Sequence, residues 1–238
     1  MSRMLHAIAG PRVPAEELRS RPWRYALPAL ALSAARVAIL VSIFLPYWTM
    51  VLEAPQYPDG LHVQAYVNHL TGDVGEIDGL NHYIGMRPLE DAAQFERSIS
   101  VYLLIAVVLL VEGAMHIHSK WAVLLVVPVI VFPPFFLIDL HLWLDHFGNN
   151  LDPAAPLSNA IKPFTPPVLG TGVIGQFKTH ASAGPGLWLA VTASACSIAG
   201  LVLHRRAFKP LFDRMRAGER SQPAARGDGG EPAPGAAS

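Results

Sequence analysis

The stretch WAVLLVVPVIVFPPFFLIDLHL, residues 121–142, decides the fold, because Asp139 is the one charged side chain within it. Hydrocarbon about 30 Å thick requires roughly 20 apolar residues in a single helix. Three other stretches come close to this length, at 33–52, 99–117 and 186–204. The whole chain of 238 residues is 52% apolar and 15% charged, which is too apolar for an ordinary soluble domain. The sequence therefore predicts an all-α integral membrane protein with four transmembrane helices.

Lys and Arg are distributed unevenly around these four spans. Residues 1–36 hold six Arg, Lys120 lies between spans two and three, and seven Lys or Arg follow His204. The stretch 51–98 holds two Arg against eight acidic residues. Short cytoplasmic segments of membrane proteins carry the excess of basic residues. Both termini are therefore expected in the cytoplasm of a bacterial cell, with two long loops on the outer side of the inner membrane.

This topology divides the chain into a basic cytoplasmic segment, a four-helix domain with two outer loops, and a cytoplasmic end, at residues 1–32, 33–204 (outer loops 53–98 and 143–185) and 205–238. The first apolar run is longer than the h-region of a signal peptide and precedes no small-residue cleavage site, so we expect it to remain. Residues 205–220 alternate apolar and basic side chains, which predicts an amphipathic helix against anionic headgroups. Residues 221–238 are rich in Pro, Ala and Gly, which is typical of a disordered tail.

The two outer loops are expected to form a cap over the outer ends of the helices. In the first loop, apolar and polar residues alternate with the period of a half-buried strand: Leu61, Val63, Ala65 and Val67 against His62, Gln64, Tyr66 and Asn68. A short β element is therefore compatible with this loop. The second loop is rich in Pro and Gly and has few charges, so we expect it to be ordered but mostly irregular.

The segment Gly79–Met86 of the first loop is dense in polar and sulfur-containing side chains. His82 and Met86 are four residues apart, which on a helical turn places both on one face. Imidazole and thioether ligands suit copper, particularly Cu(I), better than hard cations. His62 and His69 lie in the same loop and are candidate additional ligands. The residues therefore predict a copper site on the outer side of the membrane.

A simpler interpretation of the same segment needs no metal. His82 and Asn81 then hydrogen-bond to the loop backbone, while Tyr83, Ile84 and Met86 pack against the cap. Both interpretations stay open, because the spacing of one His and one Met is a weak signal. The single cysteine, Cys196, lies in the fourth span, so the chain has no disulfide framework and no Cys-based zinc site.

Two charged residues fall inside the predicted spans at similar depths, Arg36 in span one and Glu112 in span two. A charge in lipid requires a partner. We therefore expect an ion pair that holds the two spans together, with a proton or ion pathway as the alternative.

Histidines at the ends of the spans raise the possibility of haem. His116 and His118 close span two on the inner side, and His204 closes span four at a similar depth. Two histidines on neighbouring helices are the axial ligands that a b-type haem requires in a four-helix bundle. On the outer side, His141 or His146 can pair with a loop histidine in the same manner.

Several outer segments together resemble a family of small bacterial multipass membrane proteins. The segments are Ala54–Leu61, Gly72-Asp73, Glu76-Ile77, the core Leu80–Met86, and Phe164–Pro167 with Gly170. Members of that family are associated with accessory proteins of nitrous-oxide reductase maturation, including a copper-chaperone lipoprotein and a permease system. The resemblance covers about residues 46–190 and implies a periplasmic copper-handling context, with a chaperone or permease complex as partner.

The sequence contains no glycine-rich phosphate loop, no His-Glu-x-x-His motif and no nucleophile elbow, so we expect a protein that is not an enzyme. An acidic outer loop with basic inner ends also argues against nucleic acid as a partner, leaving membrane lipids. Three functions are compatible: a copper-relaying accessory protein for metalloenzyme maturation, a b-haem or quinol-linked electron-transfer subunit, and a transporter subunit or structural partner of a membrane complex. Small residues on the fourth span predict a packing face for another subunit: Ala195, Ala199 and Gly200.

Overall fold

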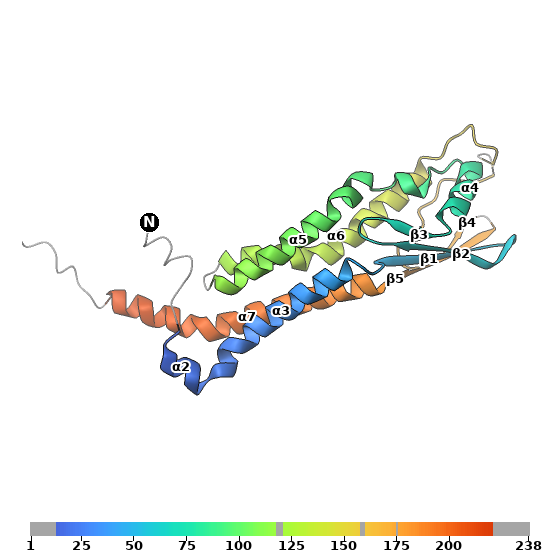
Figure 1. Cartoon of the computed structure of the whole chain (residues 1–238). Helices are drawn as coiled ribbons and strands as arrows, with labels where there is room; N and C mark the ends of the chain where they lie inside the picture. Colours follow the sequence, from blue (N-terminus) through green and yellow to red (C-terminus); the bar gives the residue numbers. More distant parts are fainter. Residues whose placement is uncertain (1–12, 118–120, 158–159, 175, 221–238) are drawn as a thin grey trace, which may run out of the picture.

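The computed structural model describes residues 13–117, 121–157, 160–174 and 176–220. Most of this part of the chain is helical, with a small antiparallel sheet at one end of a long helical bundle and helix α2 (Ala15–Ser20) at the other (Figure 1). Among the described residues, four helices are long and apolar enough to cross a membrane. They are α3 (Pro22–Ser42), α5 (Gln94–His116), α6 (Trp121–Asn149) and α7 (Pro185–Arg220).

The first long helix begins and ends earlier than the sequence predicted. Helix α3 begins at Pro22, a residue favoured in the first turn because its missing N–H needs no partner there. It ends at Ser42, and the last residues of the predicted span 33–52 instead form strand β1 (Trp48–Ala54). Pro46 explains the change, since a proline disfavours the helical conformation of the residue before it. The aromatic and β-branched residues that follow favour a strand.

The sheet is larger than the short element that the sequence allowed, so the all-α class is corrected to a mostly helical chain with a five-stranded sheet. Its antiparallel strands have the order β3-β2-β1-β5-β4. The other four strands are β2 (Tyr57–Ala65), β3 (Leu70–Gly72), β4 (Gly170–Ile174) and β5 (Phe177–Ala183). The predicted alternation in β2 is confirmed, because Leu61, Val63 and Ala65 are buried and the intervening side chains are exposed.

Both outer loops contribute to this one sheet. Strand β1 pairs with β2 of the first loop along one edge and with β5 of the second loop along the other. The second loop is irregular over residues 150–157 and 160–169, as predicted, but its last part forms strands β4 and β5. These two strands at the end of the loop were missed: in β5, lysine, histidine and serine alternate with smaller residues, and the prolines that precede the strand obscured that signal.

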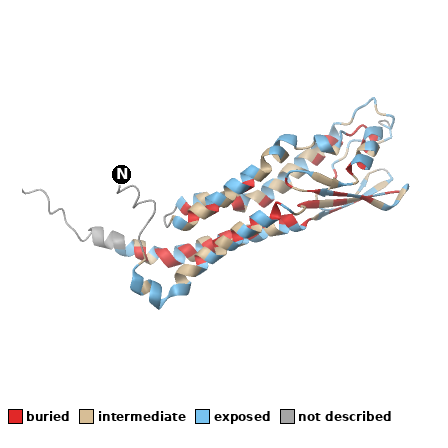
Figure 2. Cartoon of the chain, in the orientation of Figure 1, coloured by how far each residue is buried: buried red, intermediate tan, exposed pale blue. Residues whose placement is uncertain are grey.

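The four helices bury their facing sides against one another (Figure 2). Pro133 lies inside α6 and has no N–H to bond the carbonyl of Val129, one turn earlier. The Ser194 hydroxyl of α7 lies 2.9 Å from that Val129 oxygen and 3.0 Å from the Ala190 oxygen of its own helix, so it can donate to the carbonyl that Pro133 leaves without an intrahelical bond. At Gly200 of α7, a Cβ atom would lie 2.9 Å from the Leu32 side chain of α3. Gly200 therefore packs within the chain, whereas two of the small residues predicted to contact another subunit remain exposed: Ala195 and Ala199.

The predicted cytoplasmic amphipathic helix is a continuation of the fourth long helix, because α7 runs without a break to Arg220. Ala207, Phe208 and Leu211 of this extension form a small buried cluster against Tyr25. Glu17 of α2 pairs with Arg214 of α7. The remaining tail, predicted to be disordered, lies outside the described residues.

Tyr47 joins the bundle to the sheet and is fully buried. Its hydroxyl lies 2.6 Å from Ser42 Oγ, and its ring packs at 5.7 and 5.0 Å from the rings of Phe132 and Phe136. Burial raises the pKa of Tyr47 to about 12. A Cβ atom on Gly186 of α7 would lie 2.7 Å from the Tyr47 ring. The sheet is thus fixed to three of the long helices at one residue.

Candidate functional site

The structure separates the two residues predicted to bind copper. Helix α4 (Val74–Ile84) ends where Gly85 adopts a left-handed conformation with φ of 80°. Because the helix ends between them, His82 and Met86 do not share a helical face. His82 is exposed, whereas Met86 is 8% exposed and packs with Ile84 and Phe147.

The other candidate ligands of the first loop are also held apart from Met86. His62 lies on the exposed face of β2, with Nε2 3.3 Å from the carbonyl of Asp59. His69 stacks on the Tyr66 ring at 4.4 Å, and its Nδ1 lies 2.7 Å from Asn68 Oδ1. Within the described ranges, no group of three or more His, Cys, Asp or Glu side chains is placed to hold a metal ion.

The histidines considered for haem contact groups on their own helices. Nδ1 of His116 lies 3.1 Å from the carbonyl of Glu112, and the buried His204 ring stacks on Phe208 at 4.6 Å. On the outer side, His141 is exposed and Nδ1 of His146 lies 3.2 Å from the amide of Asn150. The third candidate predicted for the inner side, His118, lies outside the described residues.

The predicted partners Arg36 and Glu112 form an ion pair between α3 and α5. Arg36 also donates to Ser33 Oγ at 2.9 Å. The structure thus contains the helix-linking pair, while the alternative of an ion pathway remains a prediction.

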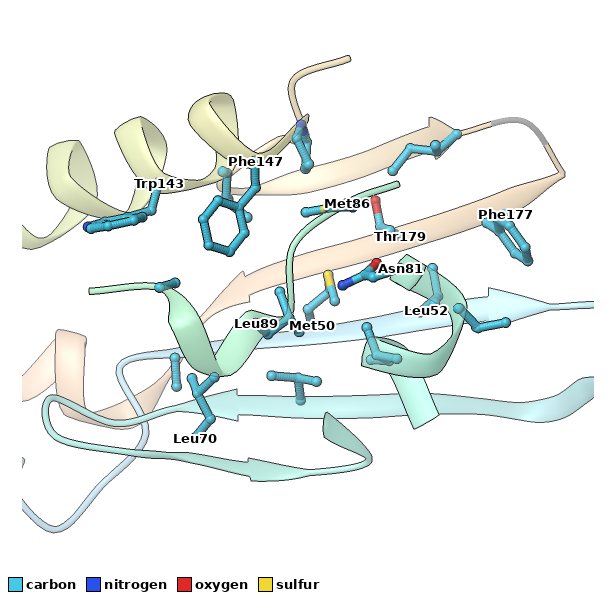
Figure 3. A pocket seen from close by; sticks show the side chains of 18 of the residues that line it. Met50, Leu52, Leu70, Asn81, Met86, Leu89, Trp143, Phe147, Phe177 and Thr179 are labelled. Carbon is cyan, nitrogen blue, oxygen red and sulfur yellow. The ribbon is translucent and has the colours of Figure 1, made fainter. Parts of the chain in front are cut away.

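A cavity lies under the sheet, and none of the predicted histidines is among the described residues that line it. Its volume is about 120 Å³, and its walls are the buried face of the sheet, α4 with the following turn, and the outer end of α6 (Figure 3). All but two of the lining residues are apolar. Large aromatic and sulfur-containing side chains make up much of the wall: Trp48, Trp143, Phe147, Phe164, Phe177, Met50 and Met86.

The two polar lining residues are Asn81 of α4 and Thr179 of β5. They are 7% and 3% exposed, and neither the Asn81 Nδ2 nor the Thr179 Oγ1 has a hydrogen-bond partner in the part of the chain that the structure describes. The Asn81 amide lies close enough to Asp78 to lower the pKa of that carboxyl slightly, but its Nδ2 makes no hydrogen bond of acceptable geometry. Because most buried polar groups in proteins are paired, two unpaired groups in one cavity require an explanation.

Asp78 shapes the rim of the cavity without lining it. Its Oδ1 accepts the backbone N–H of Leu89 at 2.6 Å, which fixes the short 3₁₀ helix η1 (Leu89–Asp91) against α4 and places the Leu89 side chain in the wall. Burial raises the pKa of the Asp78 carboxyl, and the hydrogen bond from Leu89 offsets only part of this rise. No charged side chain lines the cavity itself.

Sequence reasoning found part of this site. Asn81 and Met86 lie in the segment Gly79–Met86, which the sequence analysis identified as a candidate site, and the buried side of β2 follows the predicted alternation. Thr179, Trp48 and Met50 were missed, because one lies in the loop predicted to be irregular and the others in a predicted span. Comparisons with protein-family models, curated proteins and solved structures find no match. The arrangement itself is suited to enclosing a small apolar molecule.

Proposed function

We propose that the chain is a multi-pass membrane protein whose outer cap binds a small apolar molecule drawn from the lipid. The cavity under the sheet is the observation that carries this proposal, since it is almost wholly apolar and contains unpaired polar groups. The role is binding or relay rather than catalysis, with the long helices as the membrane anchor.

The dimensions of the long helices support a membrane-spanning arrangement. Helix α3 has 21 residues and so is about 31 Å long, close to the thickness of the hydrocarbon layer. Trp23 and Phe44, near its two ends, are 69% and 78% exposed. Exposed aromatic side chains at both ends of a span are typical of the two interfaces of a membrane.

The sheet supports the proposed topology. Strands of the first and second outer loops pair directly, so both loops lie on one side of any membrane that the helices cross. The opposite end carries the basic residues of α2, α3 and the α7 extension, including Arg19, Arg24 and Arg205. By the positive-inside rule, that end is cytoplasmic and the cap is periplasmic.

The cavity then lies at the outer interface of the membrane. Trp121 and Trp143 are separated by about 33 Å along α6, so one lies at the inner interface and the other, in the cavity wall, at the outer one. An apolar molecule dissolved in the lipid can enter a cavity at this depth with little exposure to water.

A cavity-filling variant tests this function. We expect ethylbenzene to raise the unfolding temperature of the protein in lipid nanodiscs, since a ligand at ten times its Kd stabilises the folded state by about 1.4 kcal/mol. Ala65→Leu adds volume to the cavity wall and should abolish the rise. Gln64→Leu, on the neighbouring residue and the opposite face of β2, should retain it. If ethylbenzene raised the unfolding temperature of both variants by the same amount, the proposal would be contradicted.

A second candidate function is the binding of Cu(I), in line with the sequence resemblance. The observation that favours it is that two thioethers, Met50 and Met86, line the same cavity. Thioethers are soft ligands that select Cu(I), and an accessory protein can pass such an ion to a periplasmic chaperone.

The copper candidate has its own test. In competition with a coloured Cu(I) chelator, the unaltered protein should bind one Cu(I) ion. Met50→Leu and Met86→Leu should each abolish this binding. His82→Ala should leave binding unchanged, because His82 is exposed and lies away from the cavity. No Cu(I) binding by the unaltered protein, or loss only on His82→Ala, would exclude the thioether site.

A further inference from the structure

We infer that the ligand of the cavity is an uncharged molecule that carries a carbonyl-type oxygen on a small ring or short chain, and that Asn81 and Thr179 donate hydrogen bonds to that oxygen. This inference rests on the proposed binding function and specifies its ligand. Three properties of the cavity carry it, namely its charge, its unpaired donors and its size.

The lining determines the charge of the ligand. Neither a basic nor an acidic side chain contributes to the cavity wall. An ion without a partner in such surroundings is strongly disfavoured, because it loses its hydration and gains no opposite charge. The same wall therefore disfavours fatty-acid anions and phosphate esters, and admits uncharged molecules.

The two unpaired groups determine the polar part of the ligand. Asn81 Nδ2 is a donor, and the Thr179 hydroxyl can donate one hydrogen bond. They belong to opposite walls, α4 and β5, and Figure 3 shows both among the side chains around the cavity. A carbonyl oxygen has two lone pairs and accepts two such bonds. A buried donor left unpaired destabilises the complex, so a ligand with this oxygen binds more tightly than an apolar ligand of the same shape.

The volume limits the size of the ligand. An apolar cavity of about 150 Å³ in another protein remains dry and binds benzene. The present cavity, at about 120 Å³, is of that order. The part of the ligand inside the cavity is therefore about the size of one six-membered ring, or is the carbonyl-bearing end of a short chain.

A matched pair of probes tests the inference in the full-length protein in nanodiscs. Acetophenone and α-methylstyrene have nearly the same shape, and only acetophenone carries a carbonyl oxygen. The affinity of each is obtained from the unfolding temperature as a function of its concentration in the lipid. We expect acetophenone to bind at least about tenfold more tightly, a difference of about 1.4 kcal/mol.

Variants of the two donors identify the source of that preference. In the double variant Asn81→Leu with Thr179→Val, the two probes should bind with equal affinity. If the double variant does not fold, Thr179→Val alone should reduce the preference for acetophenone. Thr179→Ser keeps the hydroxyl and should keep the preference. A preference for acetophenone that persists without both donors would overturn the inference.

The outcomes separate the inference from the function on which it rests. Binding of both probes with equal affinity would overturn the inference and leave the apolar binding function standing. Binding of neither probe would overturn both. Binding of benzoate as tightly as acetophenone would overturn the requirement for an uncharged ligand.

Discussion

At the scale of single residues, the segment 81–86 gives each side chain a separate environment. The side chains of Asn81, Ile84 and Met86 face the cavity. Those of His82 and Tyr83 face solvent. Gly85 supplies the left-handed turn between them, and its carbonyl accepts the N–H of Asp152 at 2.8 Å. These six residues thus end helix α4, contact the second loop through the backbone, and form part of the cavity wall.

Gly85→Ala should destabilise the cap. A left-handed conformation costs a residue with a Cβ about 1–2 kcal/mol, and this Cβ would also lie 2.6 Å from the carbonyl oxygen of Asp152. Gly79→Ala in the same helix is the matched control, because its Cβ would meet nothing within 4 Å and alanine is the better helix former. In chemical unfolding, Gly79→Ala should have a higher free energy of unfolding than the unaltered protein, and Gly85→Ala a lower one. Equal stability of the two variants would contradict the turn's role.

Asp78→Asn should change how stability depends on pH. The folded protein binds the Asp78 proton more tightly than the unfolded chain, because burial raises the pKa of this carboxyl. The protonated Asp78 carboxyl therefore stabilises the folded state at pH values below the pKa of Asp78 in the unfolded chain. This stabilisation is lost as the pH rises through the higher pKa of Asp78 in the folded protein. Asparagine can still accept the Leu89 N–H and carries no charge. The variant should be more stable at pH 7, by less than about 1 kcal/mol, and this advantage should vanish near pH 3.5 in thermal unfolding. An advantage independent of pH would point to another cause.

At the scale of elements, the sequence predicted the number and composition of the long helices better than their ends. The apolar run after Ser33 continues into β1, because hydropathy does not distinguish a buried strand from a membrane span. Only Pro46 and the β-branched residues after it mark the change. Thr179 could not be assigned to a site from the sequence, since its position depends on pairing between β5 and β1, which are far apart in the chain.

Ser194→Ala should weaken the packing of α7 on α6. The Ser194 hydroxyl bonds the Val129 carbonyl that Pro133 leaves without a partner, and a lost hydrogen bond of this kind costs about 1 kcal/mol. Thr192→Ala is the control, because its hydroxyl bonds only Trp188 of its own helix. Unfolding in detergent should distinguish the two variants by about that amount. A larger loss in Thr192→Ala would argue against the bond between the helices.

At the scale of the whole molecule, Tyr47 and its glycine neighbours couple the helical bundle to the sheet. Gly184 donates its N–H to the Tyr47 carbonyl at 2.9 Å, and Gly186 donates to Pro46 at 2.9 Å. These close approaches leave no room for side chains at the start of α7. The cavity therefore keeps its shape only while this junction is intact.

Gly186→Ala should disturb the cap more than the bundle. Its Cβ would lie 2.6 Å from the carbonyl oxygen of Leu45, which forces the chain between α3 and β1 to move. Hydrogen exchange should then increase in the strands while the long helices stay protected. Gly113→Ala in α5 is the control, since its nearest neighbour would be a leucine methyl at 3.6 Å. Uniform loss of protection across both regions would contradict a local role.

The position of β1 at the centre of the sheet sets the order of events during biosynthesis. Its partner β2 follows at once, but its other partner, β5, is made more than a hundred residues later, after α5 and α6. Until then β1 presents an open edge that invites wrong pairing. The sheet can therefore be completed only after α5 and α6 have folded between its two halves. A chain whose second loop could not reach the first would leave that edge of β1 without a partner.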